Sequence, residues 1–269
     1  MARYLILSLL LFAHPATADL KLFVFDCGQA SMDSMEIFGL TDEETDVREL
    51  FVPCYLVQHP KGMLLWDGGL PKAIADVDGP VDSEGSSMRY DRWIVDQLAD
   101  MNVTPADIDY AAYSHLHFDH AGAANFFLES TVLMQRTEWD GAFGSEAAFI
   151  DTSVFDGLKM ADVTFLDGDH DVFGDGSVTL IYAPGHTPGH QVLLLDLKNT
   201  GKLMLSGDLY HTRANRELRR VPTFNHDAQQ TLASMERVEK LLETRGATLW
   251  IEHDMALART LKRAPAYYD

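Results

Sequence analysis

Cysteine and basic side chains are both scarce in this sequence. Only 2 of the 269 residues are cysteine, so at most one disulfide can form within the chain. Cys27 and Cys54 could form it, or each could remain a buried thiol in its apolar surroundings. The 21 lysines and arginines are outnumbered by 41 acidic residues, and the net charge is −20. Because nucleic-acid binding depends on cationic contacts to phosphates, this balance argues against nucleic acid as a partner.

A long apolar run is also missing. A membrane-spanning helix needs about 20 consecutive apolar residues, and the run Tyr4–Phe12 is too short for one. Arg3 precedes this run and Ala16-Thr17-Ala18 follows it, which is the pattern of a cleaved signal peptide over residues 1–18. We therefore expect an exported bacterial protein, periplasmic or secreted, without a stable membrane anchor.

Internal repeats and low-complexity linkers are absent as well. With 46% hydrophobic residues, residues 19–269 are sufficient for a single domain around one core. Helical periodicity predicts a helix over Asp227–Arg245, with Asp227 as its N-cap and Gly246 as its stop, a helix over Asp91–Met101, and a helix start at Thr104-Pro105. The expected strands are Lys21–Phe25, Tyr55–His59, Met63–Trp66, Val132–Gln135, Val178–Tyr182, Gln191–Leu195, Leu203–Leu205 and Leu249–Glu252.

The segment His115-Leu116-His117-Phe118-Asp119-His120 carries four potential metal ligands. Neutral imidazoles are good ligands for zinc and similar cations, and an aspartate adds an oxygen donor. Residues at i and i+2 of a strand share a face, whereas the turn that follows redirects the next pair. The spacing therefore predicts two neighbouring ions, with His115 and His117 on one and Asp119 and His120 on the other.

Three more ligand-type side chains follow apolar strands. His186, Asp208 and His253 each come shortly after a strand that ends in turn residues. Side chains in this position gather on loops at one rim of an α/β scaffold. We therefore expect them to complete the metal centre begun by residues 115–120.

These motifs resemble those of the metallo-β-lactamase superfamily of hydrolases. The 115–120 segment, followed in order by His186, Asp208 and His253, carries the resemblance, together with Trp66-Asp67-Gly68-Gly69. Two flanking segments, residues 114–122 and 184–190, are most similar to those of the N-acyl-homoserine lactonases. The resemblance covers most of the chain after residue 20. It implies an α/β (α+β) fold, the four-layer αββα sandwich, with residues 19–269 as one hydrolase domain.

Seven metal ligands follow from the resemblance. The first zinc ion would be held by His115, His117 and His186, the second by Asp119, His120 and His253, with Asp208 as a bridge between the two ions. Asp208 stands where true β-lactamases carry a cysteine, which counts against that class. His117 stands where the diiron flavoproteins of the superfamily carry a glutamate, which favours zinc over a redox iron pair. Other divalent metals would also fit these ligands. Any single member could instead be an ordinary strand-end or helix-capping residue.

The chemistry expected of this set is hydrolysis by a hydroxide that bridges two zinc ions, which would open the lactone ring of N-acyl-homoserine lactones and so quench quorum sensing. Asp119 would also accept a hydrogen bond from the hydroxide. Asp67 is expected to orient a ligand imidazole, with His253 as the candidate. His190 is expected to support the loop that carries His186.

One position departs from the lactonase pattern. The Bacillus type of lactonase places a tyrosine three residues after the bridging aspartate, where it can donate to the carbonyl oxygen. Here His211 stands at that offset from Asp208, and Tyr210 comes one residue earlier. We assign the donor role to His211, with Tyr210 as the alternative. An equally weighted interpretation is that Tyr210 only packs and that His211 lies on the surface.

Two poorly periodic stretches, residues 32–40 and 125–155, bear on the substrate class. They contain Met35, Ile37, Phe38, Phe126, Phe127, Phe143 and Phe149. These side chains could line a channel for the acyl chain of a lactone or ester, or they could belong to the core or to a homodimer interface. The acidic loop Asp76–Glu84 could lie over the entrance.

Other functions compete with lactone hydrolysis. A phosphotriesterase or arylesterase of the same superfamily could use the same ligands. A glyoxalase-II-like thioesterase would need a helical extension at the C-terminus, yet only 16 residues follow His253. A metal-binding interaction module without catalysis is disfavoured because all the ligand positions are filled.

The remaining polar residues have simpler interpretations. The histidines outside the motifs are expected at the surface: His59, His170 and His226. The one basic cluster is expected to pair with carboxylates: Arg213, Arg216, Arg219 and Arg220.

Overall fold

The structure is a computed structural model that describes residues 20–144 and 152–269. The predicted signal peptide, residues 1–18, and Phe149 lie outside the described residues. Among the described helices, none combines the length and the apolar character that crossing a membrane requires.

The first sheet contains nine strands. Its order is β4 (Val81–Ser83), β5 (Ser86–Arg89), β1 (Lys21–Met32), β2 (Glu49–His59), β3 (Gly62–Trp66), β6 (Tyr110–Ala112), β7 (Thr131–Gln135) and β8 (Val163–Leu166), and β14 (Tyr267–Tyr268) pairs with β1. Pairing is antiparallel from β4 to β3 and parallel from β3 to β8. Parallel neighbours need crossover connections, which usually carry helices. They hold α1 (Lys72–Ala75), α2 (Ile94–Ala99), η2 (Pro105–Asp107), α3 (Phe118–Ala121), η3 (Ala124–Phe126), α4 (Arg136–Phe143) and η4 (Asp156–Met160).

The second sheet contains five strands from the later part of the chain. Its order is β13 (Thr248–Trp250), β12 (Gly201–Leu205), β11 (Gln191–Leu197), β10 (Val178–Tyr182) and β9 (His170–Asp171). The parallel step from β12 to β13 contains η5 (Gly207–Leu209), α5 (Arg213–Leu218) and α6 (Ala228–Arg245). Two short helices, η1 (Glu36–Phe38) and α7 (Met255–Ala258), lie outside these connections.

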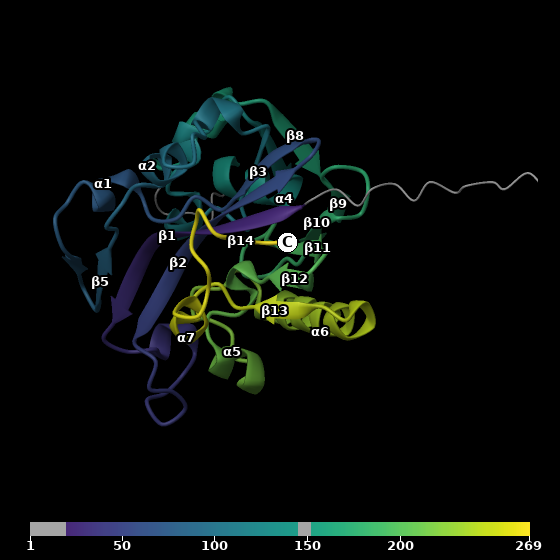
Figure 1. The fold of residues 1–269 in the computed structure, drawn as a ribbon. Helices are drawn as coiled ribbons and strands as arrows, with labels where there is room; N and C mark the ends of the chain where they lie inside the picture. The colour runs from purple at the N-terminus through teal and green to yellow at the C-terminus, as the bar shows by residue number, and fades with distance from the viewer. Residues whose placement is uncertain (1–19, 145–151) are drawn as a thin grey trace, which may run out of the picture.

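Alternating side chains build the layers. In β2, Tyr55 and Val57 belong to a core cluster that also contains side chains of the second sheet, such as Leu193. Cys54 and Leu56, on the opposite face of the same strand, pack in the cluster that includes the α2 residues. Because β2 is buried on both faces, its sequence is almost continuously apolar. Helix α6 covers the outer face of the second sheet (Figure 1), so the expected αββα sandwich is confirmed.

The long C-terminal helix begins and ends where the sequence predicts. The Asp227 side chain accepts a hydrogen bond from Gln230 N (2.9 Å), and Gly246 ends the helix with a φ of 64°. Its buried side chains recur at helical spacing, as in Met235, Val238 and Leu242. This stripe packs against the second sheet and explains why the helix was readable from its sequence.

Two helix predictions need correction. The helix predicted over Asp91–Met101 is only Ile94–Ala99, because Trp93 has an extended backbone (φ −55°, ψ 140°) and packs its ring against Tyr90. The helix predicted to start at Thr104-Pro105 is a single 3₁₀ turn. All eight strands predicted with limits are present, although β1 and β2 are longer than expected, and β4, β5, β8, β9 and β14 were not expected. The strand expected to deliver His115 is β6, but it ends at Ala112, so His115 and His117 lie in the loop that follows it and not on a strand.

The two cysteines form a disulfide between β1 and β2. Gly69 packs directly against this bridge, and a Cβ atom on Gly69 would lie 2.2 Å from Cys27 Cβ. Only glycine fits here, and its φ of 66° is also one that glycine favours. The close contact explains the glycine after Asp67-Gly68. The Cys27–Cys54 bond itself resolves the open choice between a disulfide and free thiols.

Candidate metal centre

The ligand-type side chains meet where four strands end, namely β6, β10, β12 and β13. Asp208 lies in η5, directly after β12. His117 and Asp119 are half-buried, whereas the other five predicted ligands are buried. Solvent therefore reaches the cluster on the side of His117 and Asp119.

Three histidines and Asp208 form what we call the first ligand group: His115, His117, His186 and Asp208. The Nε2 atom of His115 lies 2.8 Å from Nδ1 of His117. The Nε2 atom of His186 lies 3.1 Å from the same nitrogen. The structure thus brings together the three histidines that the resemblance assigns to one ion.

The second ligand group consists of Asp119, His120 and His253. The Nε2 atoms of the two histidines are 3.2 Å apart. Asp119 Oδ2 lies 3.8 Å from His120 Nε2 and 3.7 Å from His253 Nε2. These separations are too long for hydrogen bonds and suit groups that surround an ion.

Asp208 lies between the two groups. Its Oδ2 is 3.2 Å from His186 Nε2 and 3.6 Å from His115 Nε2. Its Oδ1 is 2.8 Å from His253 Nε2 and 3.1 Å from His120 Nε2. Each carboxylate oxygen therefore faces one group, which is the geometry of a bridging carboxylate.

The donor set fits a pair of divalent cations. His117 Nδ1 carries either one proton or one lone pair, so it cannot form good hydrogen bonds to both of its imidazole neighbours. A cation shared by three nitrogen lone pairs satisfies all of them at once. Asp208 Oδ1 is buried, and although two imidazole nitrogens lie within 3.1 Å of it, among the described residues none has the geometry of a hydrogen bond to it, as expected of an atom that binds a metal.

Charge differs between the two groups. Burial, followed by repulsion from neighbouring imidazoles, holds the pKa of His115 and of His117 well below its usual value, so both rings are neutral. Burial also disfavours charge on His253, but Asp208 outweighs this effect and raises the pKa of His253 to about 9. His115 and His117 thus offer neutral rings in the first group, whereas the Asp208 carboxylate favours the charged form of His253 in the second.

Asp67 orients a different ring from the one expected. Its Oδ2 lies 2.8 Å from Nδ1 of His120, and its Oδ1 accepts the Ser114 backbone N–H at 2.6 Å. The Nδ1 atom of His253 instead faces the carbonyl oxygen of Phe51 at 2.7 Å. The expectation that Asp67 serves His253 is therefore wrong: β2 runs beside His253 and supplies that partner from its backbone.

His190 supports the loop, as predicted. Its Nδ1 lies 3.0 Å from the Ala183 carbonyl oxygen, and its Nε2 accepts the Asp208 backbone N–H at 2.9 Å. Burial, followed by repulsion from His186, lowers the pKa of His190 to about 3, so this neutral tautomer persists. His190 therefore also holds the backbone of the bridging residue.

His211 lies inside the cluster. It is buried, and its Nε2 is 2.9 Å from Asp208 Oδ2. Its ring packs on Phe38, with centroids 4.7 Å apart. The interpretation of His211 as a surface residue is therefore wrong, and its position beside the bridge is compatible with the predicted donor role.

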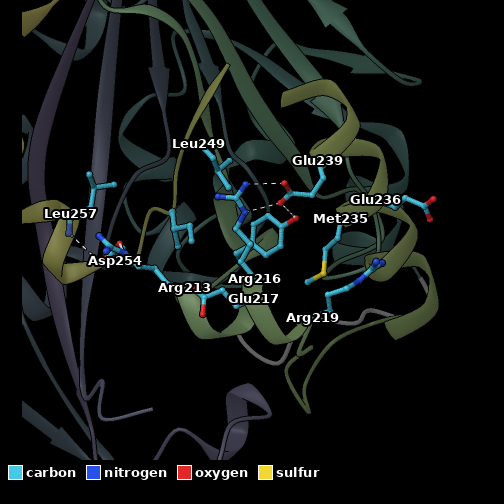
Figure 2. A pocket seen from close by; sticks show the side chains of 12 residues that line it. Arg213, Arg216, Glu217, Arg219, Met235, Glu236, Glu239, Leu249, Asp254 and Leu257 are labelled. Carbon is cyan, nitrogen blue, oxygen red and sulfur yellow. Dashed lines mark hydrogen bonds and ion pairs between the residues drawn. The ribbon is translucent and has the colours of Figure 1, made fainter. Parts of the chain in front are cut away.

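Tyr210 belongs to a separate cavity of ≈ 600 Å³. Its hydroxyl donates to Glu239 Oε1 at 2.8 Å, and the same carboxylate pairs with Arg216 at 2.7 Å. Figure 2 shows Arg216 and Glu239 facing each other there, beside Met235 of α6. Because the Tyr210 hydroxyl donates to Glu239 in this separate cavity, the structure argues against Tyr210 as the alternative donor at the metal centre.

Two polar side chains that the sequence did not single out make hydrogen bonds around the centre. Glu252 accepts hydrogen bonds from Trp66 Nε1 (3.0 Å) and Gly207 N (2.9 Å), and burial, followed by the Asp67 carboxylate, raises its pKa to about 8. Asn225 Oδ1 lies 3.3 Å from His186 Nδ1. The position of Glu252 directly before His253 was its only signal, and Asn225 had none.

The apolar residues expected around the centre separate into different environments. Ile37 is 45% exposed, while Phe38 contacts His211. Phe224, which the sequence does not single out, is 45% exposed and its ring lies 6.0 Å from that of His117.

The other candidates pack against core side chains, although Phe126 is itself 43% exposed. Met35 and Phe127 are fully buried in the core. Phe126 packs on Trp93, and Phe143 packs on Trp139. The acidic loop Asp76–Glu84 contains β4, and its place over the entrance stays a prediction.

The remaining sequence predictions have mixed outcomes. His59 is buried rather than exposed, because its ring stacks on Phe173 (4.1 Å) and its Nε2 pairs with Asp175 (2.9 Å). His226 is exposed as expected, and His170 is half-buried in β9. The basic cluster pairs as predicted except at one position: Arg213 with Asp254, Arg216 with Glu239, and Arg220 with Glu44, whereas Arg219 donates to the Leu232 carbonyl.

Relatives named as lactonases align with more than nine-tenths of this chain. The sequence matches the Metallo-beta-lactamase superfamily over residues 47–245. The N-acyl homoserine lactonase AttM of Azorhizobium caulinodans is 34% identical, with 93% of this chain and 99% of that protein covered. An N-acyl homoserine lactonase of Bacillus sp. is 30% identical, with 92% of this chain and 98% of that protein covered.

Solved structures match the fold. An N-acyl homoserine lactone hydrolase, solved with the product N-hexanoyl-L-homoserine at its catalytic metal centre, superposes with a TM-score of 0.77 at 28% identity, covering 92% of this chain and 98% of that one. The dizinc quorum-quenching lactonase AidC gives a TM-score of 0.69 at 18% identity, covering 93% and 94%, and at that identity shows the fold alone. With its two joined ligand groups and these relatives, the chain belongs to the metallo-β-lactamase superfamily and is similar there to the N-acyl homoserine lactonases.

Proposed function

We propose that this protein is a dinuclear zinc hydrolase that opens the lactone ring of N-acyl-homoserine lactones. One observation carries the proposal: Asp208 joins two ligand groups in a chain that aligns with a lactonase over 93% of its length. Two divalent ions would supply an activated water and Lewis acidity at the carbonyl group.

Two side chains have positions suited to the chemistry. Asp119 is half-buried at the solvent side of the second group, where its carboxylate can hold the attacking water and accept its proton. His211 lies beside Asp208 Oδ2, where its imidazole can donate to the oxygen that gains charge. We assign proton acceptance to Asp119 and carbonyl stabilisation to His211.

The acyl chain needs an apolar surface near the ligands. Phe224 and Ile37 are both 45% exposed, and Phe224 contacts the rings of His117 and His186. The Thr223 N–H donates to the Ile37 carbonyl at 2.8 Å, so the two segments are tied together. We propose that this surface contacts the acyl chain of the substrate.

Export is a second part of the proposal. The leader pattern over residues 1–18 supports it, and the Cys27–Cys54 disulfide is of a kind that persists in oxidising compartments. The intact mass of the protein purified from its native cells should correspond to a chain that begins near Asp19. A mass that includes Met1 would contradict cleavage.

A homodimer stays a prediction, which sedimentation analysis can test.

The enzymatic proposal is tested by metal analysis combined with a substrate panel. We expect two zinc ions per chain and turnover of acyl-homoserine lactones of varied acyl length. A simple aryl ester and paraoxon serve as comparison substrates, because the same ligands could support an arylesterase or phosphotriesterase. If paraoxon is hydrolysed while every lactone is inert, the proposal is wrong.

A further inference from the structure

One buried carboxylate outside the ligand set joins the two loops of the first ligand group. Glu138 lies in α4 and is 1% exposed. Its Oε1 accepts the backbone N–H of Leu116 at 2.8 Å, and its Oε2 accepts the backbone N–H of Gly189 at 2.8 Å. Both carboxylate oxygens are thus used to connect segments far apart in the sequence.

The two bonded residues lie next to metal-ligand positions. Leu116 stands between His115 and His117, and Gly189 stands in the loop that carries His186. The 3.1 Å separation between His186 Nε2 and His117 Nδ1 depends on how the two loops are placed relative to each other. A shift of either loop would change the shape of the first ligand group.

The surrounding sequence is shaped for this contact. A Cβ atom on Gly189 would lie 2.4 Å from Glu138 Cβ, and a Cβ atom on Gly141 of the same helix would lie 2.9 Å from Pro188 Cγ. Neither separation is tolerated by real side chains without movement. Glycine at both positions therefore lets α4 approach the His186 loop closely.

The second ligand group is held by other contacts. Asp67 faces the Nδ1 atom of His120, and the Phe51 carbonyl faces that of His253. We therefore propose that Glu138 is a positioning residue for the metal of the first ligand group and leaves the second group largely unaffected. A carboxylate is suited to this task because it accepts two hydrogen bonds from two N–H groups at once.

Keeping a carboxylate here has a cost. Burial raises the pKa of Glu138, which shows that its environment opposes the charge. Without the carboxylate, two buried N–H groups would lose their partners. Glu138 thus contributes through its hydrogen bonds to the two loops, whereas burying its charge opposes folding.

The test measures zinc affinity at each group in the full-length protein. Glu138→Gln keeps the shape but turns an N–H group toward one of the two backbone N–H groups. Zinc should bind the first group about 10- to 100-fold more weakly, as for outer contacts of metal ligands, and the second group should change less than about threefold. Zinc competition with a chelator of known affinity gives both constants. His186→Ala and His253→Ala identify which constant belongs to which group.

A second variant separates position from charge. Glu138→Asp keeps the negative charge but is too short to reach both N–H groups, so it should also weaken the first group selectively. Asp26→Asn is the control, because Asp26 is a half-buried carboxylate of β1 that also accepts a backbone N–H, from Gly28, and its hydrogen-bond partners and charged neighbours include none of the ligands. It should leave both zinc constants unchanged.

Three results would overturn the proposal. Equal weakening of both groups would show a general loss of structure. Unchanged zinc constants with a lower melting temperature would show that Glu138 only stabilises the fold. Wild-type affinity in Glu138→Asp would assign the effect to charge. Because zinc binding is measured without substrate, the outcome does not depend on whether the protein hydrolyses lactones.

Discussion

The two ligand groups of the centre are organised by different physical means. In the first, His115 and His117 are neutral imidazoles, and the loops of the group are connected through hydrogen bonds to Glu138. The second contains Asp119 and lies against Asp67 and Glu252. Geometry therefore dominates at the first group and electrostatics at the second, while Asp208 belongs to both.

This difference shows how one rim of a sandwich can form two unequal sites. Both groups take ligands from both sheets, since His186 follows β10 and His253 follows β13, but only the first has its two loops joined through Glu138. Within the second group, Asp119 and His120 share the short helix α3, and Asp67 holds His120 from the end of β3. Substitutions should therefore affect the two groups separately unless they touch Asp208.

The largest expected effect comes from removing the bridge. Asp208→Ala takes an oxygen ligand from each group, so both zinc affinities should fall and lactone turnover should drop about 1000-fold or more, because Lewis-acid stabilisation is worth several kcal/mol. Metal content and kcat/KM measure this. Asp196→Asn, at an exposed position of β11, is the control. Loss of metal from only one group would contradict the bridging role.

A selective effect on the second group is expected from Asp67→Asn. The amide can present an N–H to His120 Nδ1 in place of an acceptor, which disturbs the tautomer of that ring. Zinc affinity of the second group should fall about 10- to 100-fold, mirroring the effect of Glu138→Gln on the first. Chelator competition tests this, and weaker binding at the first group alone would break the comparison.

A smaller effect is expected where chemistry, and not metal binding, is disturbed. His211→Phe removes the proposed donor beside Asp208, so kcat should fall about 100-fold while both zinc ions stay bound. Tyr210→Phe loses only the hydrogen bond to Glu239, so kcat should be unchanged and the free energy of unfolding should fall by about 1 kcal/mol. The reverse pattern of kcat values would assign the donor role to Tyr210.

The smallest effect on the metal centre is expected from removing the disulfide. Replacing Cys27 and Cys54 by serine should lower the free energy of unfolding by about 2–4 kcal/mol, measured by denaturant titration. The bridge packs under Gly69, two residues after Asp67, so any change in metal affinity should be confined to the second group and stay within a few-fold. A change at the first group would contradict this separation.

Strand positions were readable from the sequence where burial is strong. The strand at Val178–Tyr182 has the predicted limits because its apolar run ends sharply in a Gly/Pro loop. Short edge strands such as β4 and β9 were missed, since so few residues carry no recognisable alternation. The helix predicted at Asp91 starts later because the Trp93 ring packs on Tyr90, a tertiary contact that outweighs local helix preference.

The partners of the ligands were harder to predict than the ligands. Asp67 was recognised as an orienting residue, but the ring it serves is His120. Glu138 stands in an ordinary amphipathic helix, and its own segment contains no sign that it reaches two distant loops. Such contacts join elements separated by dozens of residues, and hydrophobic periodicity contains no information about which atoms meet.

The sequence by itself determined the ligand types, their spacing and their placement at strand ends, because these depend on local residue order and on the end of each apolar run. The tertiary structure alone decided that Asp67 serves His120, that Tyr210 faces α6, and that Glu138 connects the loops of the first group. The physical reason is that residue identity fixes which side chains can bind a metal. The hydrogen-bond partners that orient those side chains come together only when the two sheets and their helices pack.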